Sequence, residues 1–127
     1  MRRRSGARDT RNHMSDKAHF LAEHLNLLPW QPNGLCTVQV GGKRLTLVRL
    51  APDQLVACAH KCPHAGGVMA EGWVTAQQEI VCPLHRYKFS LTTGRNTSGE
   101  GYHLRTYRVV QQPDGWYVEL PTSLLGW

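Results

Sequence analysis

The sequence predicts an all-β domain, either an antiparallel β-sandwich or a small barrel. Short runs of alternating apolar and polar residues recur along the chain, and turn-forming residues separate them at short intervals. Only one stretch has a helical spacing of apolar residues. At 127 residues the chain is long enough for one ordinary core, so we expect a single domain over residues 14–127.

The first three expected strands lie in residues 35–60. The runs LCTVQV and KRLTLVRL flank Gly41-Gly42, which is a signal for a two-residue hairpin turn. Pro52-Asp53 ends the second run, because these residues favour turns. The run LVACAH follows as a third strand and leads into the first group of Cys and His residues.

The remaining expected strands follow the same alternation. EIVC leads into the second Cys/His group, and YKFSLTTGRN predicts a hairpin that turns near Thr93-Gly94. LRTYRVVQQPDGWYVEL predicts two strands around Pro113-Asp114-Gly115. The whole pattern gives about eight short strands.

Residues 15–28 are the one helical candidate. Ser15 is a possible N-cap, several apolar residues fit helical spacing loosely, and Pro29 ends the stretch. A short strand followed by a turn fits the same residues almost as well.

The net charge of +6 is unevenly distributed. Residues 1–13 hold five Arg and one Asp, a net charge of +4, which leaves +2 for the rest. We interpret residues 1–13 as a disordered basic tail, either vector-derived or natural, with Met14 as the natural start. No apolar stretch follows the Arg run, so it does not read as a twin-arginine export signal. The body therefore gives no support for nucleic-acid binding.

The apolar runs and the cysteines suggest a location. No apolar run reaches the length of a membrane span, so we expect a soluble protein. Four Cys without a signal peptide indicate a reducing, cytoplasmic setting, although four Cys could also pair as two disulfides.

Three Cys lie close to a His, which favours a metal site. The chain reads Cys58-Ala59-His60, then Cys62-Pro63-His64, and later Cys82-Pro83-Leu84-His85. One pair from each group would supply two thiolates and two imidazoles, a set that a tetrahedral zinc ion accepts. A two-iron cluster accepts the same set, because two irons that share two sulfides need two protein ligands each. The spacing alone leaves both metals open.

The segments CPHAGG and VCPLHRYKFSLTTG resemble the Rieske [2Fe-2S] domain, over roughly residues 30–121. The resemblance implies Cys62, His64, Cys82 and His85 as ligands, and a [2Fe-2S] cluster of the Rieske type as the cofactor. It also implies an antiparallel β domain that carries the cluster at one tip on two loops. Cys58 and His60 lack the following glycine of the family loop, so we interpret Cys58 as a packed strand residue.

The resemblance also suggests a branch of the family. Gly67 and Leu84 occupy the positions at which respiratory Rieske proteins carry a disulfide, so that bond cannot form here. Tyr87 and Phe89 replace the residues whose hydroxyl groups hydrogen-bond to the cluster, and Phe89 has no hydroxyl. Fewer hydrogen bonds stabilise the reduced cluster less, which implies the low-potential ferredoxin branch.

We therefore expect an electron-transfer protein and not an enzyme. The resemblance implies a ferredoxin that carries one electron from a flavin reductase to a terminal oxygenase or another redox enzyme. The chain has no room for a mononuclear-iron catalytic domain. Two alternatives stay open: the small subunit of a nitrite reductase, which would bind a reductase large subunit, and a zinc-stabilised interaction module.

Overall fold

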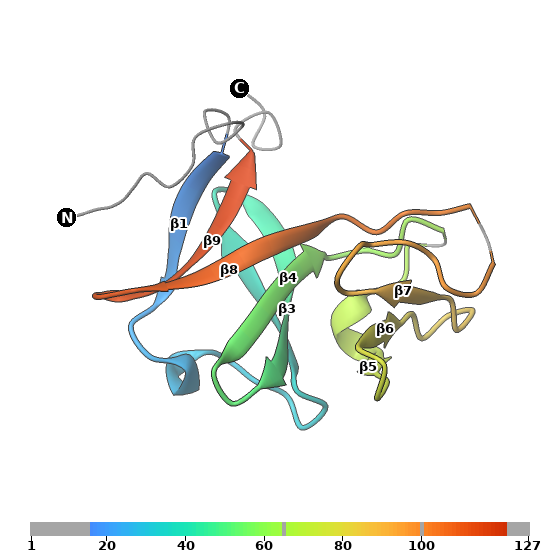
Figure 1. Ribbon diagram of the computed structural model, residues 1–127, viewed down its shortest axis with the longest axis horizontal. Coiled ribbons are helices and arrows are strands. Elements are labelled where there is room, and N and C mark those ends of the chain that lie inside the picture. Colours follow the sequence, from blue (N-terminus) through green and yellow to red (C-terminus); the bar gives the residue numbers. More distant parts are fainter. Residues whose placement is uncertain (1–15, 65, 100, 122–127) are drawn as a thin grey trace.

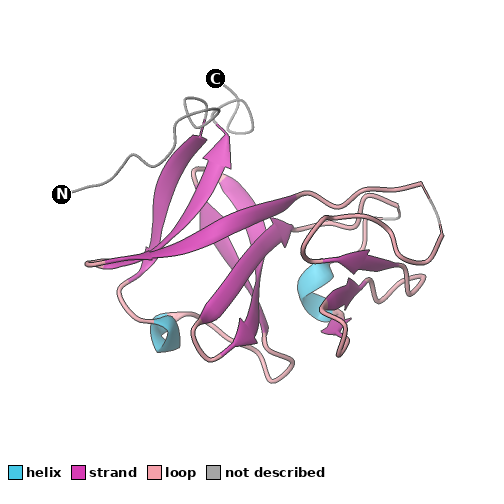
Figure 2. Cartoon of the chain, in the orientation of Figure 1, coloured by secondary structure: helices cyan, strands magenta, loops and turns pink. Residues whose placement is uncertain are grey.

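The computed structural model describes residues 16–64, 66–99 and 101–121. Figures 1 and 2 show that the regular elements of this part of the chain are mainly strands, which loops connect. The expected tail over residues 1–13 and the possible cap Ser15 lie outside the described residues. No helix of the described part is long and apolar enough to cross a membrane.

Six strands form one antiparallel sheet in the order β1-β9-β8-β4-β3-β2. Their bounds are β1 Asp16–Ala22, β2 Leu35–Val40, β3 Lys43–Ala51, β4 Gln54–Ala59, β8 Thr106–Gln112 and β9 Gly115–Pro121. The sheet curls, so that its two edge strands β1 and β2 contact each other (Figure 1). This arrangement confirms the all-β prediction and corresponds to the small-barrel alternative.

A second, three-stranded sheet lies beside the first and has the order β5-β6-β7. Its strands are β5 Trp73–Val74, β6 Glu79–Val81 and β7 Lys88–Ser90. Two single-turn 3-10 helices complete the described elements, η2 Leu25–Leu27 and η3 Met69–Glu71. In Figure 1 this small sheet stands at the right-hand end of the molecule, next to η3.

Two hydrophobic cores explain why the central strands are buried on both faces. One core fills the inside of the curled sheet and includes Leu47, Ala57 and Val118. The other lies between the curled sheet and the small sheet and includes Val48, Cys58 and Phe89. Because neighbouring residues of a strand point to opposite faces, β3 and β4 contribute to both cores at once.

Side-chain hydrogen bonds also tie the small sheet to the large one. The segment before β2 supplies Gln31 and Asn33, whose amides donate to the carbonyl of Ala70 at 2.7 and 3.0 Å. Asn33 also donates to the carbonyl of Gly72 at 3.0 Å. These bonds fix the positions of η3 and the start of β5, the two elements that directly follow the first Cys/His loop.

The main differences from the sequence predictions concern two segments. Residues 16–28 contain β1 and η2 rather than a helix, which is the alternative of a strand and a turn. The hairpin expected in residues 87–96 forms only its first strand, β7, and the returning chain makes a single bridge between Phe89 and Asn96.

Candidate metal centre

The four expected ligands lie in two loops of the small sheet. We call residues 60–68, which follow β4, the first loop, and residues 82–87, between β6 and β7, the second loop. Cys62 and His64 belong to the first loop, and Cys82 and His85 belong to the second. Both loops lie at the right-hand end of Figure 1.

The two loops share one pattern of backbone hydrogen bonds, counted from their cysteines. Each cysteine amide donates to the carbonyl five residues later, at 2.7 Å for Cys62 to Gly67 and 2.9 Å for Cys82 to Tyr87. Each cysteine carbonyl accepts the amide four residues later, at 2.9 Å in both loops. The chain therefore presents the cysteines of the two loops on equivalent turns.

The residue four positions after each cysteine adopts a left-handed backbone conformation. In the first loop this residue is Gly66, with φ of 74°, and in the second it is Arg86, with φ of 61°. Glycine reaches this region without strain, whereas a residue with a side chain does not. The second loop therefore holds Arg86 in a strained conformation, in the same turn that places Cys82.

The two thiols are buried and lie close together. Cys62 is 3% exposed and Cys82 is 1% exposed, and both belong to the core between the two sheets. Burial raises the pKa of Cys82, and the neighbouring Cys62 raises it further, while the amides of Leu84 and His85 lower it. The amide of His64 donates to the Cys62 sulfur at 3.4 Å. Backbone donors are thus already aimed at the sulfurs, where they stabilise negative charge.

The two imidazoles lie together nearer the surface. The Nδ1 atoms of His64 and His85 are 3.3 Å apart, and the two rings meet edge to face with centroids 4.9 Å apart. His64 is partly buried, whereas His85 is exposed. Both rings therefore turn the same nitrogen toward a common point.

Two tyrosines cover one of these imidazoles. Tyr87 stacks on His64 with centroids 4.1 Å apart and an interplanar angle of 17°, and Tyr102 meets it edge to face at 4.9 Å. Tyr102 comes from the segment between β7 and β8, which a hydrogen bond from the Leu104 amide to the Gly94 carbonyl, at 2.8 Å, holds in place. The sequence alone did not assign Tyr102 to the site, because its contact with His64 depends on how this segment folds back onto the first loop.

The donors fit a two-iron cluster by their chemistry. The sulfurs form one pair and the imidazoles another, and each pair can serve one iron. Two thiolates and two ferric irons with two sulfides also sum to zero charge, which limits the cost of holding the group at a partly buried site.

The other cysteines and the nearby histidine are placed differently. Cys58 is fully buried in β4, as predicted for a packed strand residue, and Cys36 is fully buried in β2. The half-buried His60 has a buried Nδ1 atom with no hydrogen-bond partner among the described residues.

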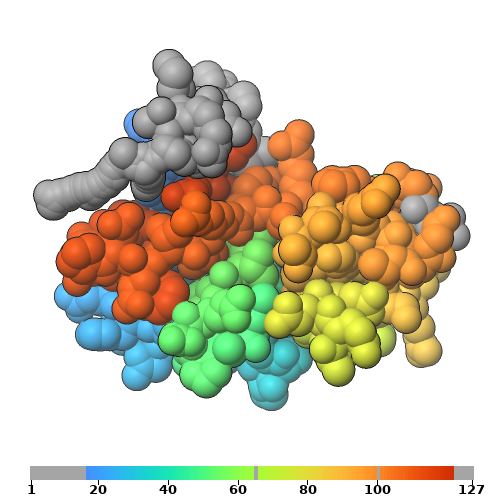
Figure 3. Space-filling view, in the orientation of Figure 1, coloured from blue at the N-terminus to red at the C-terminus, as the bar shows by residue number. Residues whose placement is uncertain are grey.

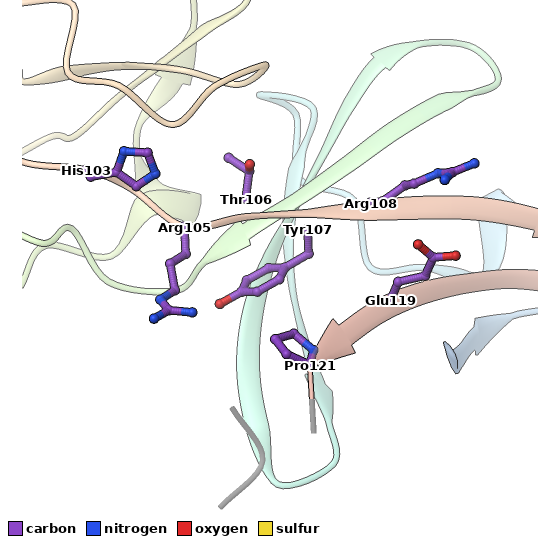
Figure 4. A pocket seen from close by; sticks show the side chains of 7 residues that line it. All are labelled: His103, Arg105, Thr106, Tyr107, Arg108, Glu119 and Pro121. Atoms are coloured by element: carbon purple, nitrogen blue, oxygen red, sulfur yellow. The ribbon is translucent and has the colours of Figure 1, made fainter. Parts of the chain in front are cut away.

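A surface hollow of about 500 Å³ lies along β8 and β9. Figure 4 shows Arg105, Tyr107 and Glu119 among its lining residues. Burial raises the pKa of Tyr107, and the nearby Arg105 opposes that rise. None of the four expected ligands lines this hollow, so it is separate from the candidate metal centre.

Comparisons with known proteins agree with this geometry. Residues 21–108 match the Rieske [2Fe-2S] domain family. The ferredoxin component of a naphthalene 1,2-dioxygenase system from Pseudomonas aeruginosa is 36% identical over 58 residues. That match covers 46% of this chain and 54% of the relative, so the chain aligns with about half the length of the curated protein.

Solved structures give the same fold. The ferredoxin of carbazole 1,9a-dioxygenase from Nocardioides aromaticivorans superposes with a TM-score of 0.67 and 28% identity, over 82% of this chain and 97% of that chain. A protein described as an NADH-dependent nitrite reductase small subunit from Mycobacterium tuberculosis superposes with a TM-score of 0.66 and 21% identity, over 83% of this chain and 94% of that one. The second likeness concerns the fold alone.

The family match covers most of the chain and includes both loops. A Rieske-type [2Fe-2S] cluster is the cofactor that this family implies. This chain belongs to the Rieske [2Fe-2S] domain family.

Proposed function

We propose that Cys62, His64, Cys82 and His85 hold the [2Fe-2S] cluster, with both thiolates on one iron and both imidazoles on the other. The single observation that carries the assignment is the sorting of the donors into a buried sulfur pair and a surface imidazole pair. The imidazoles would bind through Nδ1, because these are the atoms that face each other. We also keep the prediction of one domain over residues 14–127.

We propose that the chain is a one-electron carrier and not a catalyst. When bound, a cluster of this type takes up one electron and gives it back. The buried sulfurs would lie on the protein side, shielded from water, while His85 faces solvent. Electrons would therefore leave through the imidazole end, where a partner can approach.

The partners that we propose are a flavin reductase as electron donor and a terminal oxygenase as acceptor. Support comes from the two ferredoxins of dioxygenase systems that resemble this chain at 36% and 28% identity. Both redox partners and this carrier would work in the cytoplasm, where buried unpaired thiols such as Cys36 and Cys58 stay reduced.

The first test is the colour and metal content of the protein after gentle anaerobic purification. We expect a red-brown protein with two irons and two acid-labile sulfides per chain, which a one-electron reductant bleaches in part. We further expect a reduction potential near the low end of the Rieske range, roughly −150 mV, because Phe89 offers no hydroxyl to the cluster. A colourless protein with one tightly bound zinc would instead support the interaction-module alternative.

A further inference from the structure

The charges of this chain are separated along the molecule. We define the cluster end as residues 60–68, 82–88 and 93–105, which are the two loops with their flanks and the segment that carries Tyr102. Its cations are Lys61, Arg86, Lys88, Arg95 and Arg105. Its one acidic residue, Glu100, lies outside the described residues. The cluster end therefore has a net charge of +4, from five cations and one carboxylate.

The rest of residues 14–127 has the opposite sign. It holds five Lys or Arg and seven Asp or Glu, a net charge of −2. The two parts together give the +2 of the body. Glu79 of the second part hydrogen-bonds to Thr97 and lies near Lys88, so its carboxylate offsets part of the positive charge of the cluster end. Figure 3 shows that much of the right-hand end of the molecule is made of β7 and the segment after it, in gold and orange.

The same end exposes apolar side chains next to the imidazoles. Leu84 is 56% exposed and Tyr102 is 41% exposed, and both are among the large apolar residues that the described part leaves open to solvent. Leu84 directly precedes the exposed His85, and the ring of Tyr102 contacts His64. An apolar centre with a charged rim is the usual composition of a docking surface between proteins.

We infer that the cluster end is a docking surface for a redox protein whose own contact surface is rich in Asp and Glu carboxylates. This inference rests on the proposed electron-carrier function. A cluster with two thiolates is neutral when oxidised, so binding it would leave the positive field of the loops in place. Opposite charges raise the rate of encounter and turn the two proteins toward each other before contact.

One electron on the cluster would lower the charge of this end by one. The reduced carrier would then meet an acidic surface with slightly less attraction than the oxidised carrier does. After the carrier has passed its electron to such a surface, its charge would rise again. The docking would therefore be strongly salt-dependent.

Two double variants of equal net charge test the inference. Arg86→Glu/Arg95→Glu reverses two cations of the cluster end, and both residues are exposed. Lys17→Glu/Arg108→Glu makes the same change on β1 and β8 of the curled sheet, also at exposed residues. Lys88 is left unchanged in both variants, because it interacts with the carboxylate of Glu79. Hydrogen bonds from Thr97 and Thr75 lower the pKa of Glu79, and the positive charge of Lys88 lowers it further.

The first measurement is elution from a carboxymethyl matrix, which presents a surface of carboxylates. We expect the cluster-end variant to elute at a clearly lower salt concentration than the control variant, although the two have the same net charge. Equal elution of the two variants would overturn the inference. This readout does not depend on electron transfer.

The second measurement is oxidation of the reduced protein by two small probes of opposite charge. Ferricyanide takes one electron from the cluster and becomes ferrocyanide, and tris(phenanthroline)cobalt(III) takes one electron and becomes the cobalt(II) complex. At an ionic strength of about 0.01 M we expect the cluster-end variant to react at least about tenfold more slowly than the control with ferricyanide, and faster than the control with the cobalt complex. Both differences should disappear at about 1 M salt.

The outcomes separate the two proposals. A protein without the [2Fe-2S] absorbance would contradict the proposed function, while the elution test would still decide the charge of the surface. A protein with a reducible cluster but equal rates for the two variants would contradict the docking surface alone. If the double variant fails to fold, Arg95→Glu against Arg108→Glu repeats both measurements with a residue outside the two loops.

Discussion

Arg86 is the structural counterpart of Gly66. Each lies four residues after the cysteine of its loop, donates its amide to that cysteine's carbonyl at 2.9 Å, and has a left-handed backbone conformation. The two loops differ in that only the second carries a side chain at this position. The strain of a left-handed residue is therefore stored beside His85.

Replacing Arg86 with glycine should stabilise the protein. A left-handed conformation costs a residue with a side chain about 1–2 kcal/mol, and the greater freedom of glycine in the unfolded chain returns about 0.5–1 kcal/mol of that. We expect Arg86→Gly to raise the free energy of unfolding by about 0.5–1 kcal/mol in urea denaturation. Arg86→Ala removes the guanidinium but keeps the strain, so an equal gain in that control would contradict the explanation.

A methyl group at Gly67 should impair the metal centre. A Cβ at Gly67 would lie 2.9 Å from the Cys82 sulfur and 3.0 Å from Cγ of Leu84. We expect Gly67→Ala to lower the iron and sulfide content of the purified protein, because the sulfur of Cys82 must shift. Gly101→Ala is the control, since a Cβ there meets nothing within 4 Å. Full occupancy in Gly67→Ala would show that the loop accommodates the methyl group.

Substitution of single cysteines tests the choice of ligands. Cys62→Ala and Cys82→Ala should each abolish the visible absorbance, because one iron loses a thiolate. Cys58→Ala and Cys36→Ala should keep the spectrum, because both residues are packed in strands. Loss of the cluster in Cys58→Ala, together with its retention in Cys62→Ala, would reverse the assignment.

Removal of the Tyr102 ring should shorten the lifetime of the cluster in air. The ring covers one side of His64, with centroids 4.9 Å apart. We expect Tyr102→Ala to lose its visible absorbance several-fold faster than the unaltered protein, because water and oxygen gain access to the imidazole. Tyr102→Phe keeps the ring and should decay at the original rate. If the phenylalanine variant decays as fast as the alanine variant, the hydroxyl and not the ring protects the site.

The stability of the fold should decline in alkaline solution, partly because of Cys58. Burial raises the pKa of its thiol from 9.0 to about 12. Between these values the unfolded chain has lost the proton and the folded chain keeps it, so the folded state binds more protons and its stability falls as pH rises. The slope for one such group is about 1.4 kcal/mol per pH unit.

Urea denaturation across this pH range, under reducing conditions, measures the slope. Cys58→Ala should show a shallower decline above pH 9.0 than the unaltered protein. Cys36, whose pKa is raised by burial to about 11, remains in both proteins and contributes equally. Parallel curves for the two proteins would mean that the Cys58 thiol ionises as easily in the folded state as in the unfolded one.

The sequence predicted those hairpins whose turns contain residues that favour a turn by themselves. Gly41-Gly42 joins β2 to β3, and Pro113-Asp114 joins β8 to β9, as expected from local residues alone. The strand β1 was less predictable, because it exists through pairing with β9 at the far end of the chain. Its local spacing of apolar residues fits a helix equally well.

The candidate site was predictable in its donors and not in its surroundings. Family resemblance selected Cys62 over Cys58, and the structure places Cys58 within β4. Tyr102 could not be assigned from sequence, because its segment reaches the loops only through tertiary contacts. The strain at Arg86 did have a signal: aligning CPHAG with CPLHR from their cysteines places Arg86 opposite Gly66.

The chain leaves the curled sheet after β4 and returns to it at β8, and these two strands are neighbours. Cys58 pairs with Thr106, and the Ala59 amide donates to the Arg105 carbonyl at 2.9 Å, so the two ends of the excursion lie side by side. All four donors lie within this one continuous piece of chain. This piece should therefore be transferable to another pair of antiparallel strands without a change in the path of the host chain. The host must offer an apolar face like that of Leu35 and Val48, and amide donors like those of Gln31 and Asn33.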